Sequence, residues 1–177
     1  MERDGVITVP DRPAAGWRVR PVLASEVWPI RHQVLRPERP LESSRYPGDE
    51  RPGTRHFAVL NRGRPVGVGS VYHEDPPAEF TVPGLEPGLG WHLRGMATLE
   101  EIRGTGAGSA LLRTALANAV LAGAGAVWCK AGTSAADFYR KHGFQTLGYE
   151  FEIPGLGPHL FMYWMDARAA PITLPLR

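Results

Sequence analysis

A chain of 177 residues with 43% hydrophobic and 21% charged residues has the size and composition of one globular domain with a sizeable core. Its 20 basic and 18 acidic residues leave a net charge of +2, which gives no reason to expect a nucleic-acid partner. The single cysteine, Cys129, excludes an intramolecular disulfide and a cysteine-rich metal site. No apolar run reaches membrane-spanning length and the N-terminus lacks a signal-peptide core, so we expect a cytoplasmic protein without membrane contact or metal.

The first part of the chain predicts a strand and a helix. Residues 1–16 have the composition of a loosely held arm. Residues 17–20, Trp-Arg-Val-Arg, alternate apolar and basic side chains as a strand does. Ser25 is placed to cap a helix that runs to about Arg36, just before Pro37. The residues expected to face the interior are Val27, Ile30, Val34 and Leu35.

The middle of the chain predicts irregular segments on both sides of a hairpin. Residues 37–54 and 74–90 are rich in proline and glycine, so both are expected at the surface, the first with room for a helical turn. Between them, two apolar runs at 56–60 and 65–72 flank a short turn and predict an antiparallel hairpin. Residues 93–98 then predict a short strand.

A glycine-rich turn follows that strand and opens a helix. Residues 103–108, Arg-Gly-Thr-Gly-Ala-Gly, let the backbone approach a ligand closely, and the first amides of the helix are unpaired at its positive end. Such a turn is suited to phosphate. The Lys-Ser/Thr pair of a P-loop and the Gly-x-Gly-x-x-Gly spacing of a dinucleotide site are both missing. The helix ends near Gly123, and its apolar face is formed by Leu111, Leu112, Ala115, Leu116, Ala119 and Val120.

The last part of the chain predicts three strands and a short helix. Residues 126–130 form a buried strand, parallel to 93–98 because a right-handed crossover joins them. Ser134 is expected to cap a short helix that ends at residues 140–143. Two final strands are expected at 144–153 and 160–165, followed by a loose tail from residue 167.

Two motifs resemble the GNAT N-acetyltransferase superfamily. The turn at 103–108 resembles its Arg/Gln-x-x-Gly-x-Gly/Ala signature, with residues 96–101 similar to the family's central strand and acidic loop. Residues 135–144 are similar to its second signature, in which a Phe/Tyr-Tyr pair precedes Gly-Phe. The segment 93–98 and Gly157-Pro158-His159 with Met162 resemble a subgroup of small bacterial members of unassigned substrate.

The resemblance implies an α/β fold of mixed α+β type over residues 17–166. Its sheet would be mostly antiparallel, with one splayed parallel pair and flanking helices. The implied co-substrate is acetyl-CoA, with its pyrophosphate on the turn amides and its pantetheine arm along the backbone of residues 96–98. The N–H of Ala97 would polarise the thioester carbonyl. The cofactor-binding residues expected are Met96, Ala97, Thr98, Arg103, Gly104, Thr105, Gly106, Ala107, Gly108, Ser109 and Phe138.

The resemblance also implies direct transfer to a primary amine of a small molecule or peptide. Tyr139 matches the family's general acid, which protonates the departing thiolate. No base is obvious, and His92 is our candidate, with Arg94 and His73 as alternatives. His159 either lines the acceptor cleft or braces its turn. Homodimers are frequent in the family, so a homodimer is one expectation.

Three basic residues lie on the first predicted helix, and one segment departs from the family pattern. Arg31, His32 and Arg36 are assigned to a solvated helix face near the implied acceptor site. The segment 131–133, Ala-Gly-Thr, stands where many members carry an asparagine that binds the pantetheine arm. This departure and the missing base leave open one alternative to the transferase, a non-catalytic acyl-CoA-binding or sensing domain. Use of a longer acyl chain is a further alternative.

Overall fold

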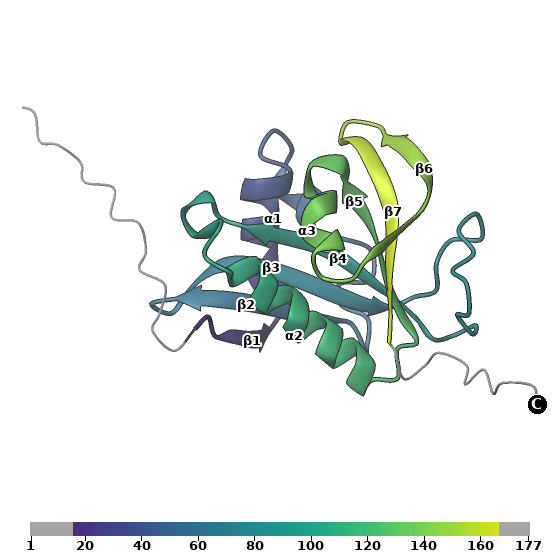
Figure 1. Ribbon diagram of the computed structural model, residues 1–177. Coiled ribbons are helices and arrows are strands. Elements are labelled where there is room, and N and C mark those ends of the chain that lie inside the picture. Colours follow the sequence, from purple (N-terminus) through teal and green to yellow (C-terminus); the bar gives the residue numbers. More distant parts are fainter. Residues whose placement is uncertain (1–15, 167–177) are drawn as a thin grey trace, which may run out of the picture.

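The computed structural model describes residues 16–166, and residues 1–15 and 167–177, which hold most of the expected arm and the expected tail, lie outside it. A single seven-stranded sheet in the order β1-β2-β3-β4-β5-β7-β6 is flanked by helices (Figure 1). The strands are β1 (Val19–Val22), β2 (Arg55–Asn61), β3 (Arg64–His73), β4 (Gly90–Thr98), β5 (Ala126–Gly132), β6 (Gln145–Ile153) and β7 (Gly157–Met165). The helices are α1 (Ala24–Leu35), α2 (Ala107–Leu121) and α3 (Ala136–Arg140), with 3-10 turns at Leu41–Ser44, Glu100–Ile102 and Thr133–Ala135.

One parallel pair interrupts an otherwise antiparallel sheet. β4 and β5 pair in parallel only at Gly90–His92 and Ala126–Trp128. Beyond these three positions the two strands are no longer paired, and Figure 1 shows β5, β7 and β6 turning away from β1–β4. The predicted mixed fold with a splayed parallel pair is therefore confirmed.

The two long helices cover opposite faces of the sheet. Because side chains alternate along a strand, Ser70 and Tyr72 of β3 lie on the face toward α1, and Gly69 lies on the face toward α2. A Cβ at Gly69 would lie 2.5 Å from the sulfur of Met96, so the glycine leaves room for Met96, and Leu111 of α2 lies on the same face at 3.6 Å. The apolar face predicted for α2 is buried as expected, except that Val120 is only half-buried. None of the helices within residues 16–166 combines the length and apolarity needed to span a membrane.

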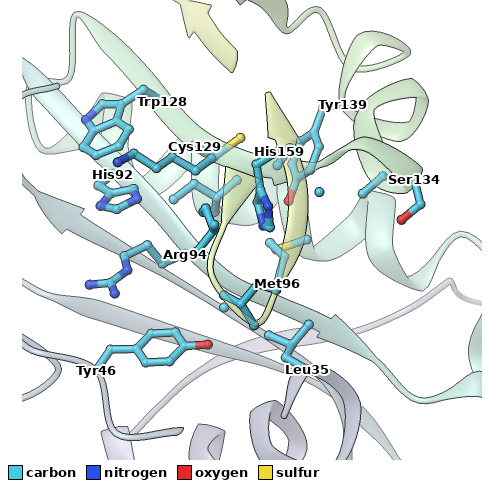
Figure 2. A pocket seen from close by; sticks show the side chains of 18 of the residues that line it. Leu35, Tyr46, His92, Arg94, Met96, Trp128, Cys129, Ser134, Tyr139 and His159 are labelled. Carbon is cyan, nitrogen blue, oxygen red and sulfur yellow. The ribbon is translucent and has the colours of Figure 1, made fainter. Parts of the chain in front are cut away.

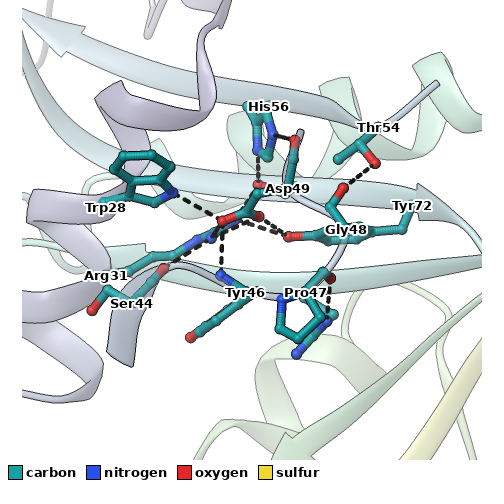
Figure 3. A network of polar contacts seen from close by, with 12 residues as sticks. Trp28, Arg31, Ser44, Tyr46, Pro47, Gly48, Asp49, Thr54, His56 and Tyr72 are labelled. Carbon is teal, nitrogen blue, oxygen red and sulfur yellow. Dashed lines mark hydrogen bonds and ion pairs between the residues drawn. The ribbon is translucent and has the colours of Figure 1, made fainter. Parts of the chain in front are cut away.

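Arg31 of α1 is fully buried, which corrects its assignment to a solvated helix face. Its guanidinium forms an ion pair of 2.8 Å with Asp49 and donates hydrogen bonds to Ser70 Oγ at 2.6 Å and Tyr72 Oη at 3.0 Å (Figure 3). An isolated buried charge is very costly, so the side chain enters the interior only because these partners compensate it. Leu35, which was expected inside, is instead 37% exposed.

Asp49 collects the donors of this network from three segments. The indole N–H of Trp28 and the backbone N–H of Tyr46 both bind Oδ2 at 2.9 Å, and Tyr72 Oη donates to Oδ1 at 2.5 Å. Burial by itself raises the pKa of Asp49, but the Tyr72 hydrogen bond, the Arg31 charge and the other donors outweigh burial and lower it. The irregular segment 37–54 is thereby tied to α1 and to β3.

Two boundaries near the site differ from the sequence-based expectations. Ser134 does not cap α3; the N-cap position is Ala135 and a 3-10 turn precedes the helix. β4 begins at Gly90 rather than at Leu93, because its first residues complete the parallel ladder with β5.

We expect Asp49→Asn to lower the free energy of unfolding by about 3–5 kcal/mol, because the Arg31 charge then stays buried without a counterion. Because folding lowers the pKa of Asp49, its ionised form stabilises the protein at any pH above the pKa in the unfolded chain, about 3.9. This stabilisation is lost as the pH falls through the pKa of Asp49 in the folded protein. The difference in the free energy of unfolding between wild type and Asp49→Asn should thus be equal at pH 7 and pH 5 and shrink below about pH 4. Urea denaturation at each pH measures it.

Asp137→Asn is the matched control, because Asp137 pairs with Arg140 while its side chain is 82% exposed. This variant should lose no more than about 0.5 kcal/mol. Equal losses in the two variants would show that the buried pair has no special role.

Candidate active site

A pocket of about 620 Å³ lies where β4 and β5 separate. Its walls come from β4, β5, the start of α3, the end of α1 and the β6–β7 turn (Figure 2). Among the residues predicted for catalysis or binding, Met96, His92 and Tyr139 line this pocket. The gap between these two strands is thus lined by elements that lie far apart in the sequence.

A bulge shapes β4 beside the pocket. Val68 of β3 lies opposite Ala97 and Ser70 opposite Arg94, so Gly95 and Met96 together oppose the single residue Gly69. Gly95 has a positive φ of 64°, and a Cβ there would lie 2.5 Å from Nε of Arg31. Only glycine fits this position without displacement, so the buried arginine and the bulge depend on each other.

The bulge also decides which amides face the open edge of β4. The N–H of Leu99 donates to Val66 O at 2.8 Å, and the register then continues to Ala97 opposite Val68. Because amide directions alternate along a strand, the Ala97 N–H points toward β3 and the Thr98 N–H points to the opposite edge. This geometry favours Thr98, rather than the Ala97 expected from sequence, as a donor on the edge that β5 leaves free.

The glycine-rich turn lies at the N-terminus of α2, apart from the pocket lining. Gly104 and Gly106 have φ values of 76° and 88°, and no atom lies within 4 Å of a Cβ built at either residue. Within the described chain no side chain caps α2, so its first-turn amides remain free to bind an anion. The indole N–H of Trp17 donates to Thr105 O at 3.2 Å and fixes the turn, a contact that no sequence motif marks.

The other expected cofactor residues lie around this turn. Phe138 is half-buried, and its ring would be 3.6 Å from a Cβ at Gly108, so it packs directly over the start of α2. Arg103 is exposed, and its side chain is free to reach a bound phosphate. The roles of these residues in binding stay predictions.

Tyr139 of α3 is buried, with a relative exposure of 7%, and its hydroxyl points into the pocket (Figure 2). Burial raises the pKa of Tyr139 well above its ordinary value, and the neighbouring Cys129 raises it further. The hydroxyl therefore keeps its proton at neutral pH and is a hydrogen-bond donor. Burial likewise raises the pKa of Cys129, which makes it the inert core thiol that the sequence predicts.

His92 of β4 enters the pocket stacked on Trp128, with ring centroids 3.6 Å apart. Its Nδ1 lies 3.2 Å from Oε2 of Glu74, so a neutral ring that donates through Nδ1 leaves Nε2 as a proton acceptor. Burial, and then the positive charges of Arg94 and Lys130, lower the pKa of His92 to about 2. Glu74 was not identified from sequence, because it begins a proline-rich segment without any motif.

The other two histidines considered differ in position. His73 stacks on Trp91 and its Nε2 lies 2.7 Å from Gly88 O, so it is outside the pocket lining. His159 lines the pocket, and its Nδ1 also contacts Gly157 O at 2.8 Å, so it both borders the cleft and braces its turn. Within residues 16–166, no group of three or more His, Cys, Asp or Glu side chains is arranged to hold a metal ion.

Comparison with known proteins places this geometry in a family. Residues 22–144 match the acetyltransferase (GNAT) family. The chain is 34% identical over 145 residues to YitI, an uncharacterized N-acetyltransferase of Bacillus subtilis, covering 82% of this chain and 93% of that protein. The chain therefore belongs to the GNAT acetyltransferase family and is an acyltransferase.

Solved structures share the fold at low sequence identity. An aminoglycoside 6'-N-acetyltransferase complexed with coenzyme A is similar with a TM-score of 0.65 and 13% identity, over 84% of this chain and 96% of that one. An IAA acetyltransferase from Bacillus cereus is similar with a TM-score of 0.62 and 15% identity, over 85% of this chain and 100% of that one. At these identities the likeness establishes the fold.

We expect Gly95→Ala to destabilise the protein more than Gly63→Ala. Both glycines have positive φ, 64° and 81°, which costs a side chain about 1–2 kcal/mol. Only at Gly95 does the new Cβ also collide with Arg31, which adds about 1–3 kcal/mol. Urea denaturation of both variants measures the difference, and equal losses would contradict the coupling between Arg31 and the bulge.

Proposed function

We propose that this protein transfers an acetyl group from acetyl-CoA directly to a primary amine. The observation that carries the proposal is the pocket between the diverging strands β4 and β5, into which the Tyr139 hydroxyl points. The open edge of β4 on one side and a protonated donor on the other suit a thioester that enters between the strands.

The free amides at the start of α2 are suited to the pyrophosphate of the co-substrate. Gly104 and Gly106 present no side chain there, and the helix end contributes partial positive charge. The pantetheine arm would then run along residues 96–98, adding to the edge of β4 that β5 leaves unpaired. The coenzyme A in the aminoglycoside acetyltransferase of the same fold supports this choice of co-substrate.

The transfer requires two proton movements, and the pocket holds a group for each. As the C–N bond forms and the C–S bond breaks, the amine must lose a proton, which Nε2 of His92 accepts as Nδ1 passes its own proton to the Glu74 carboxylate. The ring then never carries the positive charge that its surroundings disfavour. The amide edge of β4 stabilises the negative oxygen. Tyr139 Oη donates to the departing sulfur, so the reaction ends with an amide and a free thiol.

We expect Tyr139→Phe to reduce turnover by about 10²-fold while acetyl-CoA still binds, because the change removes one donor that acts late in the reaction. Amine-dependent release of free CoA across an amine panel measures turnover, and calorimetry measures binding. Tyr149→Phe is the matched control, because Tyr149 is 93% exposed on β6, and it should behave as wild type.

The same assay separates the transferase from the sensing domain. Binding of acetyl-CoA without amine-stimulated release, in wild type and Tyr139→Phe alike, would favour the sensing domain. Failure to bind acetyl-CoA would contradict both functions, since both depend on the glycine-rich turn.

We expect the pH profile of kcat/KM to show no inflection near 6.5, because the pKa of His92 is lowered to about 2 and the ring stays neutral through the accessible range. The acidic limb should instead follow ionisation of the acceptor amine. His92→Gln should lower kcat/KM about 10²-fold without moving that limb. A wild-type inflection near 6.5 that is lost in the variant would contradict the neutral histidine.

A further inference from the structure

The charged side chains that line the pocket are mostly positive. Arg36, Arg94 and Lys130 line it, and Glu74 is the one acidic residue in the lining found within the described chain. Overall the protein has a net charge of only +2, so this is a local concentration rather than a property of the whole surface. A wall of this kind attracts anions into a cleft.

Two of these cations converge on one aromatic ring. The guanidinium carbon of Arg94 lies 4.7 Å from the centroid of the Tyr46 ring and that of Arg36 lies 5.1 Å from it. In Figure 2 the Arg94 guanidinium is drawn between the rings of His92 and Tyr46. Arg36 and Arg94 thus both lie against Tyr46, as does the buried Arg31 at 4.3 Å, and the two pocket-lining arginines on this ring are called the cluster below.

No carboxylate compensates this cluster. Among residues 16–166, neither Arg36 nor Arg94 forms an ion pair; the Arg94 Nη1 only reaches Pro47 O at 3.5 Å. Nε of Arg36 is buried and has no hydrogen-bond partner in this part of the chain. Planar guanidinium groups with free donors are the side chains best matched to a carboxylate or phosphate.

The two other charged residues of the pocket lining are Glu74 and Lys130. Glu74 lies next to His92, where the proposed proton acceptor would meet the amine, and its side chain is half exposed. The ammonium of Lys130 lies 5.9 and 5.8 Å from the rings of Phe80 and Phe151, over the irregular segment and β6. An amine would therefore find a carboxylate at its reacting end and guanidinium groups beyond it.

We propose that the acceptor is a primary amine whose other end carries an anionic group, a carboxylate or a phosphate, bound by the cluster of Arg36 and Arg94. This inference rests on the proposed function, because it names the substrate class of the same site. The cluster supplies binding and orientation, and Glu74 with His92 receives the amine. Neutral and polycationic amines lack the anion and gain nothing from the cluster.

The test compares matched acceptors that differ only in the anion. The probes are ω-amino acids of increasing length against their amides, and phosphoethanolamine against ethanolamine, assayed by CoA release with saturating acetyl-CoA at pH 8. For at least one pair we expect kcat/KM to be about 10- to 100-fold higher for the anionic member. The carboxylate and phosphate arms identify which anion is preferred, and added salt should reduce the advantage.

The variants Arg94→Gln and Arg36→Gln connect this preference to the cluster. Each should reduce the ratio between anionic and neutral acceptors toward 1, by raising KM for the anionic member, while KM for acetyl-CoA is unchanged. Arg113→Gln removes the same charge from an exposed position on α2, which covers the other face of the sheet, and should leave the ratio intact. Equal rates for both members of every pair, or a ratio that survives in both cluster variants, would overturn the inference.

Failure of the proposed function gives a different result. If no amine stimulates CoA release, the transferase function is contradicted. Calorimetry of the same pairs on the CoA-loaded protein then tests whether the cluster binds the anionic member of each pair. Anion-dependent binding lost in Arg94→Gln would keep the site, and equal binding or none would overturn it.

Discussion

The buried ion pair between Arg31 and Asp49 is the interaction on which the site depends. A guanidinium with no exposure needs its charge compensated, and the partners of the two Arg31 Nη atoms come from β3 and from the irregular segment before β2. The pair therefore fixes a segment of chain whose regular structure is a single 3-10 turn. It also sits against Gly95, so the position of the arginine and the bulge in β4 are set together.

The bulge in β4 and its divergence from β5 together leave backbone amides of β4 unpaired at one edge. Three parallel pairs hold the strands together at one end, and beyond them the edge of β4 is open. A sheet edge with free amides is usually protected from pairing with other chains. In this protein it lies inside a pocket, where an extended ligand of the right width is able to complete the ladder.

Burial sets the protonation states of both proposed catalytic groups. It keeps Tyr139 protonated, and together with Arg94 and Lys130 it keeps His92 neutral. The donor and the acceptor are thus ready at neutral pH without either having to titrate near it. The same cations that suppress the charge on His92 make the pocket positive, so one arrangement of charges affects both the chemistry and the acceptor.

The sequence by itself determined most of the elements and the glycine-rich turn, because glycine spacing and helical periodicity are local signals that act within a few residues. The strand order around β4 and β5, the helix face of α2 and the position of Tyr139 followed from the same patterns and from the family resemblance. Only the tertiary structure decided that Arg31 is buried, that Glu74 pairs with His92, and that Arg36 and Arg94 share the Tyr46 ring. Each of these depends on partners far away in sequence, and a charged residue carries no local sign of whether its counterion lies in the solvent or in a distant segment of the chain.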